Sequence, residues 1–146
     1  MTGAGVAGGF IDLIGPVDLI PVDLIPVDLI PVDLRAGPEG GKRLAFTVAA
    51  RHLDPSGQCH PGMLTAFADH VLGTLARAAV AEAGGAGVAT VSLNCDFIGT
   101  VAASETVDGE AQIIRRTRSL VFVAGLLHVS GRTVLSANGI WKVLAP

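Results

Sequence analysis

One segment of this 146-residue chain has the apolar spacing of a long α-helix, and this segment constrains the fold most. Between residues 61 and 83, apolar side chains recur three or four positions apart, which places them on one helix face. These side chains are Leu64, Phe67, Ala68, Val71, Leu72 and Leu75. Pro61 suits a first helical turn, and Gly84-Gly85 ends the pattern. The sequence therefore predicts one long helix whose apolar face needs a second layer to cover it.

The remaining segments are typical of β-strands. Before the helix, Arg43–Arg51 has the composition of a strand that runs on towards Leu53, and Asp54-Pro-Ser-Gly57 has the residues of a turn. After the helix come four stretches rich in Val, Ile, Leu and Thr, at residues 88–98, 106–116, 119–130 and 133–143. Turns at residues 116–118 and 130–132 separate the last three. We expect an α+β domain in which these four strands form an antiparallel meander around the helix.

The N-terminal region repeats a Pro-Val-Asp-Leu unit every five residues, from Pro16 to Pro31. This period fits neither a helix nor a strand, and a proline in every unit excludes a helix interior or a central strand. We interpret the repeats as a tandem expansion of one unit; the alternative is a linear motif that adds a strand to a partner. We expect a flexible terminus at residues 1–9, an expanded and partly irregular first-strand region at 10–34, and the folded domain at 35–146.

The charge distribution limits the possible partners. The net charge is -3, so no overall basic field suggests nucleic acid. Five of the thirteen acidic residues lie within residues 12–33, which leaves eight acids and ten bases elsewhere. The rest of the chain is therefore positive, and this sign suits a small anionic ligand. Half of the residues are apolar, which excludes disorder over the whole chain.

The sequence gives little sign of export, membrane insertion or metal binding. Two cysteines, Cys59 and Cys95, cannot form a disulfide framework and have no metal-site spacing. No basic segment precedes an apolar run at the N-terminus, and no uncharged apolar run approaches the ~20 residues of a membrane-spanning helix. We expect a cytoplasmic protein without a metal or a membrane.

Chemically useful residues gather around the start of the helix. His60 comes directly before it, where backbone N–H groups lack intrahelical partners and the helix dipole is positive. Such an end can polarise a carbonyl group. Asp69 lies in an otherwise apolar stretch, roughly 120–140° around the helix from the centre of the apolar face. Its carboxylate therefore flanks the core and faces either solvent or a second subunit.

This region resembles the PaaI-like acyl-CoA thioesterases of the hotdog fold. Cys59-His-Pro-Gly-Met-Leu-Thr-Ala-Phe-Ala-Asp69, preceded by His52-Leu-Asp-Pro-Ser-Gly57, is similar to the family pattern H-x-N-P-x-G-x-x-H-G-G-x-x-x-x-x-A-D. The similarity continues almost without interruption over residues 35–144. The resemblance implies a hotdog fold, in which five to six antiparallel strands wrap around one central helix. It also implies an aryl- or medium-chain acyl-CoA substrate, with coenzyme A as part of that substrate and no separate cofactor.

The resemblance also implies roles for particular residues. Asp69 occupies the position of the general base or nucleophile, and Thr90 is the nearest match to the residue that assists the attacking water. His60 positions the helix start, whose backbone N–H groups polarise the thioester carbonyl. Arg116 and Arg118 are candidates for binding the phosphates of coenzyme A. The family's site lies between subunits, which implies a homodimer or a dimer-of-dimers tetramer.

Two departures from the family pattern fall on the carbonyl-binding side. Pro61 replaces the first glycine after the histidine and has no N–H, and Asp54 replaces an asparagine that donates a hydrogen bond. Either the Gly62 N–H takes over, or Asp54 is protonated and donates. Because of these departures, a second function stays open, that of a hotdog protein that binds acyl-CoA without hydrolysing it. A hotdog dehydratase ranks third, because Asp69 follows Gly62 by seven residues instead of about five.

Two other side chains near the helix start carry weaker hypotheses. Cys59 beside His60 suggests a cysteine nucleophile, but the side chains of adjacent residues diverge. His70 is expected on the helix surface and not as a proton carrier.

Overall fold

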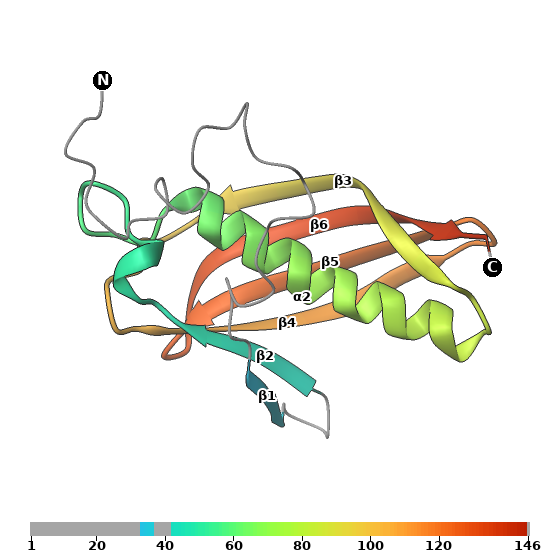
Figure 1. Ribbon diagram of the computed structural model, residues 1–146, viewed down its shortest axis with the longest axis horizontal. Coiled ribbons are helices and arrows are strands. Elements are labelled where there is room, and N and C mark those ends of the chain that lie inside the picture. The colour runs from blue at the N-terminus through green and yellow to red at the C-terminus, as the bar shows by residue number, and fades with distance from the viewer. Residues whose placement is uncertain (1–32, 37–41, 146) are drawn as a thin grey trace.

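The protein is described here by a computed structural model that covers residues 33–36 and 42–145. Its regular elements are six strands, one long helix and one short 3-10 helix (Figure 1). In chain order they are β1 (Asp33–Ala36), β2 (Lys42–Thr47), the 3-10 helix (Ala50–His52), α2 (Pro61–Glu82), β3 (Gly87–Phe97), β4 (Thr106–Arg116), β5 (Leu120–Val129) and β6 (Arg132–Leu144).

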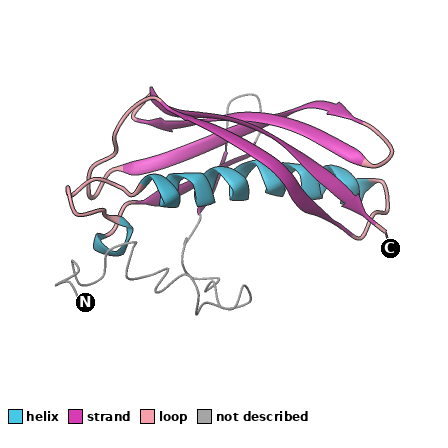
Figure 2. Cartoon of the chain, turned by 90° about the horizontal axis from the view of Figure 1, so that it is seen from above, coloured by secondary structure: helices cyan, strands magenta, loops and turns pink. Residues whose placement is uncertain are grey.

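All six strands belong to one antiparallel sheet, in the order β1-β2-β4-β5-β6-β3. The sheet curls along α2, which lies against one face only (Figure 2). The predicted α+β hotdog architecture is therefore confirmed. No helix among the described residues is long and apolar enough to cross a membrane.

The prediction of a four-strand meander was wrong in one respect. β4, β5 and β6 follow one another as hairpins, but β3 pairs with β6 and not with β4. Both sides of β4 are already occupied, by β2 and β5. The chain after β3 therefore passes the end of the sheet, where the N–H groups of Ile98 and Gly99 donate to the carbonyl of Val134. As a result, β3 forms one edge of the described sheet.

The strand predicted for residues 43–51 ends earlier, at Thr47. His52 causes the change of direction, because its Nδ1 accepts a hydrogen bond from the Ala49 N–H at 3.0 Å while its own N–H donates to the Ala49 carbonyl at 2.9 Å. The imidazole is fully buried, and its ring packs edge-on against Phe46. Residues 50–52 consequently form a 3-10 turn that carries the chain to the start of α2.

The core lies between α2 and the concave face of the sheet. Phe67 and Leu72 on the helix are completely buried, and burying each such side chain stabilises the fold by about 1.5–3 kcal/mol. Gly109 and Gly125 let the helix approach the central strands closely. A β-carbon at Gly109 would lie 2.7 Å from Val71, and one at Gly125 would lie 2.7 Å from Leu72. The helix is thereby held in a fixed position against the sheet.

The predicted turns between elements have the expected backbone. The N–H groups of Gly84 and Gly85 return to helix carbonyls and end α2 at Glu82, one residue before the predicted end. Ser130 and Gly131 both have positive φ, 48° and 82°, and form the tight connection between β5 and β6. The repeats before Pro31 lie outside the described residues, and the predicted boundary between residues 34 and 35 falls within β1.

Candidate active site

The centre of the candidate site is a hydrogen bond between the helix and the edge strand. Thr90 Oγ1 on β3 donates to Asp69 Oδ1 on α2 at 2.9 Å. Asp69 is half-buried and Thr90 is exposed, so the pair lies at the margin of the core, where solvent can reach it. The structure thus brings together two residues that are 21 positions apart and were both proposed from the sequence. The position of Asp69 beside the apolar face agrees with the expected helix geometry.

Sequence reasoning missed a cysteine next to this pair. Cys95 on β3 lies close enough to Thr65, one helical turn before Asp69, for the Thr65 hydroxyl to act on the pKa of its thiol. Burial raises the pKa of the Cys95 thiol, and the charges of Asp69 and Asp96 raise it further. The thiol is therefore protonated at neutral pH. Cys95 lies on the helix side of the sheet, because the β3–β6 register places it opposite the buried Ala137.

The start of α2 is capped by its own histidine. His60 is the N-cap residue, and its Nδ1 accepts a hydrogen bond from the Gly62 N–H at 2.8 Å. This contact requires the neutral ring with its proton on Nε2. Pro61 occupies the first helical position, as predicted, and donates nothing. The Gly62 N–H proposed as a donor to the substrate is thus directed at the His60 ring.

The loop before the helix fixes Asp54 as an acceptor. Asp54 Oδ1 accepts hydrogen bonds from Ser56 Oγ at 2.5 Å, from Ser56 N at 2.8 Å and from Gln58 N at 3.2 Å. The hydrogen bond from the Ser56 hydroxyl has the largest effect, and together these bonds hold the pKa of Asp54 below its usual value. The hypothesis that Asp54 is protonated and donates a hydrogen bond to the substrate is therefore wrong. The sequence signal was present, because Asp-Pro-Ser-Gly is a turn in which the aspartate bonds the backbone beyond it.

A hollow of about 290 Å³ opens between the helix start and the end of β3. Its walls combine loop and helix residues with apolar side chains at the end of β3 and directly after it. They include Asp54, Gln58, Pro61, Leu64, Phe97 and Ile98. The hollow lies at the N-terminus of α2, and Asp69 is about 12 Å further along the helix. It gives a ligand access to the helix start.

The other side chains proposed near the helix start have different environments. Cys59 is 4% exposed, and burial raises the pKa of its thiol to about 12, so it is a poor nucleophile. His70 is exposed on the helix surface, as predicted, and burial of part of its ring lowers its pKa. It is therefore neutral at physiological pH.

The two arginines proposed for coenzyme A lie near the far end of the helix. Arg116 Nη1 donates to the Ala79 carbonyl at 2.6 Å and so binds the last turn of α2. Arg118 is exposed in the turn between β4 and β5. Ala79 follows Asp69 by ten residues, about 15 Å along the helix axis. The structure therefore separates these guanidinium groups from the helix start and leaves them at the surface.

The sequence and the fold both have known relatives. Residues 56–136 match the family described as the thioesterase superfamily. This match covers α2 and most of the sheet, including His60, Asp69 and Thr90. No protein with curated annotation matches the chain.

Several solved structures share the fold. A phenylacetic acid degradation-related protein from Ralstonia eutropha JMP134 is 28% identical, with a TM-score of 0.71 over 90% of this chain and 96% of that one. The PaaI protein of the E. coli phenylacetic acid degradation operon is 19% identical, with a TM-score of 0.70 over 81% and 83% of the two chains. The BH2602 protein from Bacillus halodurans, solved with CoA, is 16% identical, with a TM-score of 0.75 over 97% and 92%.

Proposed function

The chain belongs to the thioesterase superfamily, and from this premise we propose that it hydrolyses an aryl- or medium-chain acyl-CoA thioester. The observation that carries the proposal is the Asp69–Thr90 hydrogen bond at the margin of the core. It holds a carboxylate in a defined orientation at a point that solvent reaches. The names of two relatives, from phenylacetic acid degradation, and the CoA bound to a third support the substrate class.

In the proposed reaction, Asp69 acts on the thioester carbonyl carbon. As general base, its carboxylate takes a proton from a water molecule while the water oxygen attacks that carbon. The tetrahedral intermediate then collapses, the carbon–sulfur bond breaks, and the thiolate of CoA leaves. As nucleophile, Asp69 would instead form an acyl-carboxylate anhydride that water hydrolyses. In both routes the Thr90 hydroxyl donates to Oδ1 and so fixes the orientation of the Asp69 carboxylate.

Because the start of its own helix is about 12 Å from Asp69, the carbonyl oxygen would lie at the N-terminus of α2 of a second copy, where the helix dipole favours developing negative charge. The Gly62 N–H is the nearest backbone donor to this position after Pro61, but it donates to His60. It can bind the oxyanion only if the His60 ring moves aside. For this reason we expect slow turnover.

The edge position of β3 supports a homodimer with the site at its interface. Val91, Phe97 and Ile98 lie on or directly after this strand and are 60%, 50% and 59% exposed. β3 pairs with β6 on one side, and none of the described strands pairs with its other side. A long apolar edge of this kind is suited to pairing with a second copy. In this arrangement the partner would also cover Asp69, and Arg116 and Arg118 would meet the CoA phosphates at the surface.

The alternative function is acyl-CoA binding without hydrolysis. Three features at the helix start favour it: Pro61 has no N–H, Asp54 is an ionised acceptor, and the Gly62 N–H is engaged by His60. A thioester carbonyl would then bind without activation.

Release of free thiol from a panel of aryl- and medium-chain acyl-CoAs separates the two functions. We expect measurable wild-type turnover and a loss of about 10²–10⁴-fold in Asp69→Asn, as for a general base. Glu82→Gln removes a carboxylate from the exposed C-terminal end of the same helix and is the matched control. Turnover that survives Asp69→Asn would rule out the role of Asp69. Thermal stabilisation by an acyl-CoA without any thiol release would establish the binding protein.

A further inference from the structure

The segment that joins β3 to β4 forms one wall of the hollow of about 290 Å³ at the helix start. Gly99 and Thr100 in this segment line the hollow, and Leu64, Phe97 and Ile98 give it an apolar lining beside them. In the proposed function the thioester carbonyl binds at the helix start, so this hollow would receive the acyl group next to it. The position of the wall at Gly99 and Thr100 therefore decides which acyl groups fit.

Backbone hydrogen bonds fix this segment on either side of Thr100. The Gly99 N–H donates to the Val134 carbonyl on β6 at 3.1 Å. On the other side, the Val101 carbonyl accepts from the Cys59 N–H at 2.7 Å, which ties the segment to the loop before α2. The Thr100 carbonyl lies between these two points, and the hydrogen bond that holds it comes from a side chain.

Arg132, the first residue of β6, provides this hydrogen bond. Its Nη1 donates to the Thr100 carbonyl at 3.0 Å, and its Nη2 donates to Glu105 Oε2 at 2.8 Å. A β-carbon at Gly99 would lie 3.4 Å from Nη1, so the guanidinium group packs directly against the backbone of the wall. The rigid fork of a guanidinium group holds two acceptors in a fixed geometry, whereas the ammonium group of lysine is a point charge.

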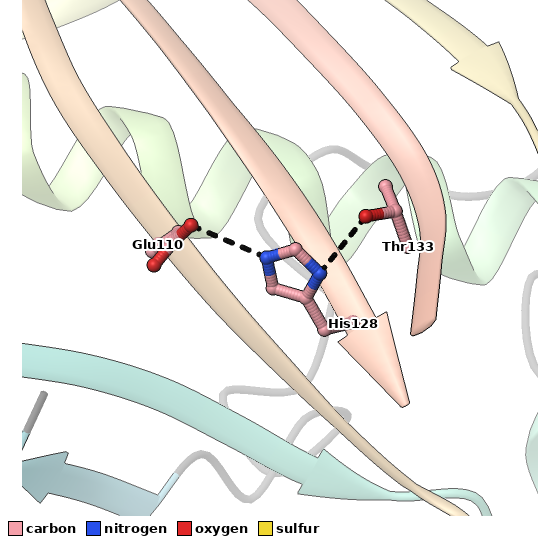
Figure 3. Close-up of polar contacts among 3 residues, drawn as sticks. All are labelled: Glu110, His128 and Thr133. Atoms are coloured by element: carbon pink, nitrogen blue, oxygen red, sulfur yellow. Dashed lines mark hydrogen bonds and ion pairs between the residues drawn. The ribbon is translucent and has the colours of Figure 1, made fainter. Parts of the chain in front are cut away.

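The backbone that carries Arg132 is itself fixed by side chains of the sheet. The β5–β6 pairing shifts register between Leu127 and His128, so the regular ladder is interrupted just before the turn. Here His128 contacts Thr133 Oγ1 through Nδ1 and Glu110 Oε1 through Nε2, both at 3.2 Å (Figure 3). Because Thr133 directly follows Arg132, these contacts tie the start of β6 to both β5 and β4.

We propose that Arg132 is a positioning residue that selects the acyl group, an inference that rests on the proposed function. Through the Thr100 carbonyl it sets the wall of the hollow, and Glu105 holds its guanidinium group in place. The ion pair contributes little to stability, because its side chains are 49% and 35% exposed. Removing it should therefore leave the fold intact and change the wall alone.

The test compares wild type and Arg132→Ala in thiol release from a series of acyl-CoAs whose acyl groups increase in size. For the preferred substrate we expect kcat/KM to fall by about tenfold, mainly through a higher KM, and the preference over smaller and larger acyl groups to fall with it. A loss of folded protein would instead lower the rates for all substrates by the same factor. Arg77→Ala removes an exposed arginine from α2 and is the matched control, which should keep the wild-type ranking.

Two conservative variants separate the charge from the geometry. Arg132→Lys keeps a positive charge but not the fork, and should recover only part of the preference. Glu105→Gln keeps an acceptor oxygen for the guanidinium group and should retain most of it.

The proposal is overturned if Arg132→Ala keeps the wild-type ranking, if it lowers kcat/KM for every acyl group by the same factor, or if the wild type has no preference. An absence of thiol release in the wild type would count against the thioesterase function alone. The same comparison is then made on the dissociation constants of these acyl-CoAs, measured by isothermal titration calorimetry. An absence of both turnover and binding overturns both proposals.

Discussion

The two halves of the candidate site differ in how far they keep the family pattern. On the α2–β3 side, Asp69 and Thr90 occupy the expected positions and are joined by a hydrogen bond of 2.9 Å. At the helix start, Pro61 and Asp54 each replace a residue that donates a hydrogen bond in the family pattern. The remaining donor, the Gly62 N–H, donates to the His60 ring. In the proposed reaction, the half that would attack the substrate is thus complete, whereas the half that would receive negative charge has lost its donors.

This difference indicates which half limits the reaction. A carboxylate can remove a proton from water without help from the helix start, but the negative charge that develops on the carbonyl oxygen must then be stabilised by solvent. Losing one donor to an oxyanion typically costs about 10²–10³ in rate. The helix start, and not Asp69, therefore sets the expected turnover.

The largest effect is expected from restoring both donors. The double variant Pro61→Gly, Asp54→Asn regains a backbone N–H and a side-chain amide, and its kcat for thiol release should rise by about 10²-fold. Lowering the assay pH to about 5 should not reproduce the effect of Asp54→Asn on kcat. The pKa of Asp54 lies below its usual value, so the carboxylate stays ionised there.

The matched control adds Asp69→Asn to the double variant. If the two halves act in one reaction, this triple variant loses the gain. A double variant no faster than the wild type would mean that the helix start does not bind the carbonyl oxygen.

Much of the fold was predictable because its signals are local. The apolar spacing of α2, the glycines after it and the turn residues between the late strands each act within a few positions. The strand order was not predictable in this way, because β3 and β6 pair through residues that are about 50 positions apart in the sequence. The early end of β2 was missed for another reason: a buried His52 that bonds the backbone of Ala49 leaves no mark in a hydropathy pattern.

The site was predictable in part. Asp69 and Thr90 follow from the family pattern, and helix geometry alone indicates that Asp69 flanks the core. The engagement of Gly62 by His60 depends on the rotation of one imidazole ring. The proximity of Cys95 to Asp69 depends on how β3 crosses α2. Neither the ring rotation nor the crossing angle is encoded in residue spacing.

A smaller effect is expected on the attacking side from Thr90→Val. The substitution keeps the shape of the side chain and removes the hydroxyl that donates to Asp69 Oδ1. A hydrogen bond to a charged group is worth about 1.5–3 kcal/mol, less where solvent competes, so kcat should fall by about tenfold. Thr90→Ser keeps the hydroxyl and should retain most of the activity. Equal losses in both variants would assign Thr90 a packing role only.

The smallest effect is expected at Cys59, which adjoins His60 but belongs to neither half. The thiol is 4% exposed, and with a pKa of about 12 it stays protonated throughout the assay range. A protonated, buried thiol does not attack a thioester, so Cys59→Ala should keep kcat within about twofold once the fraction of folded protein has been measured by denaturation in urea. A cysteine nucleophile predicts the opposite, namely the loss of nearly all turnover together with a covalent acyl adduct in wild-type protein quenched during the reaction. Intact-protein mass spectrometry detects such an adduct directly. If the adduct were found on Cys59, the attacking group would lie at the helix start, and the division of the site into an attacking half and a carbonyl-binding half would be wrong.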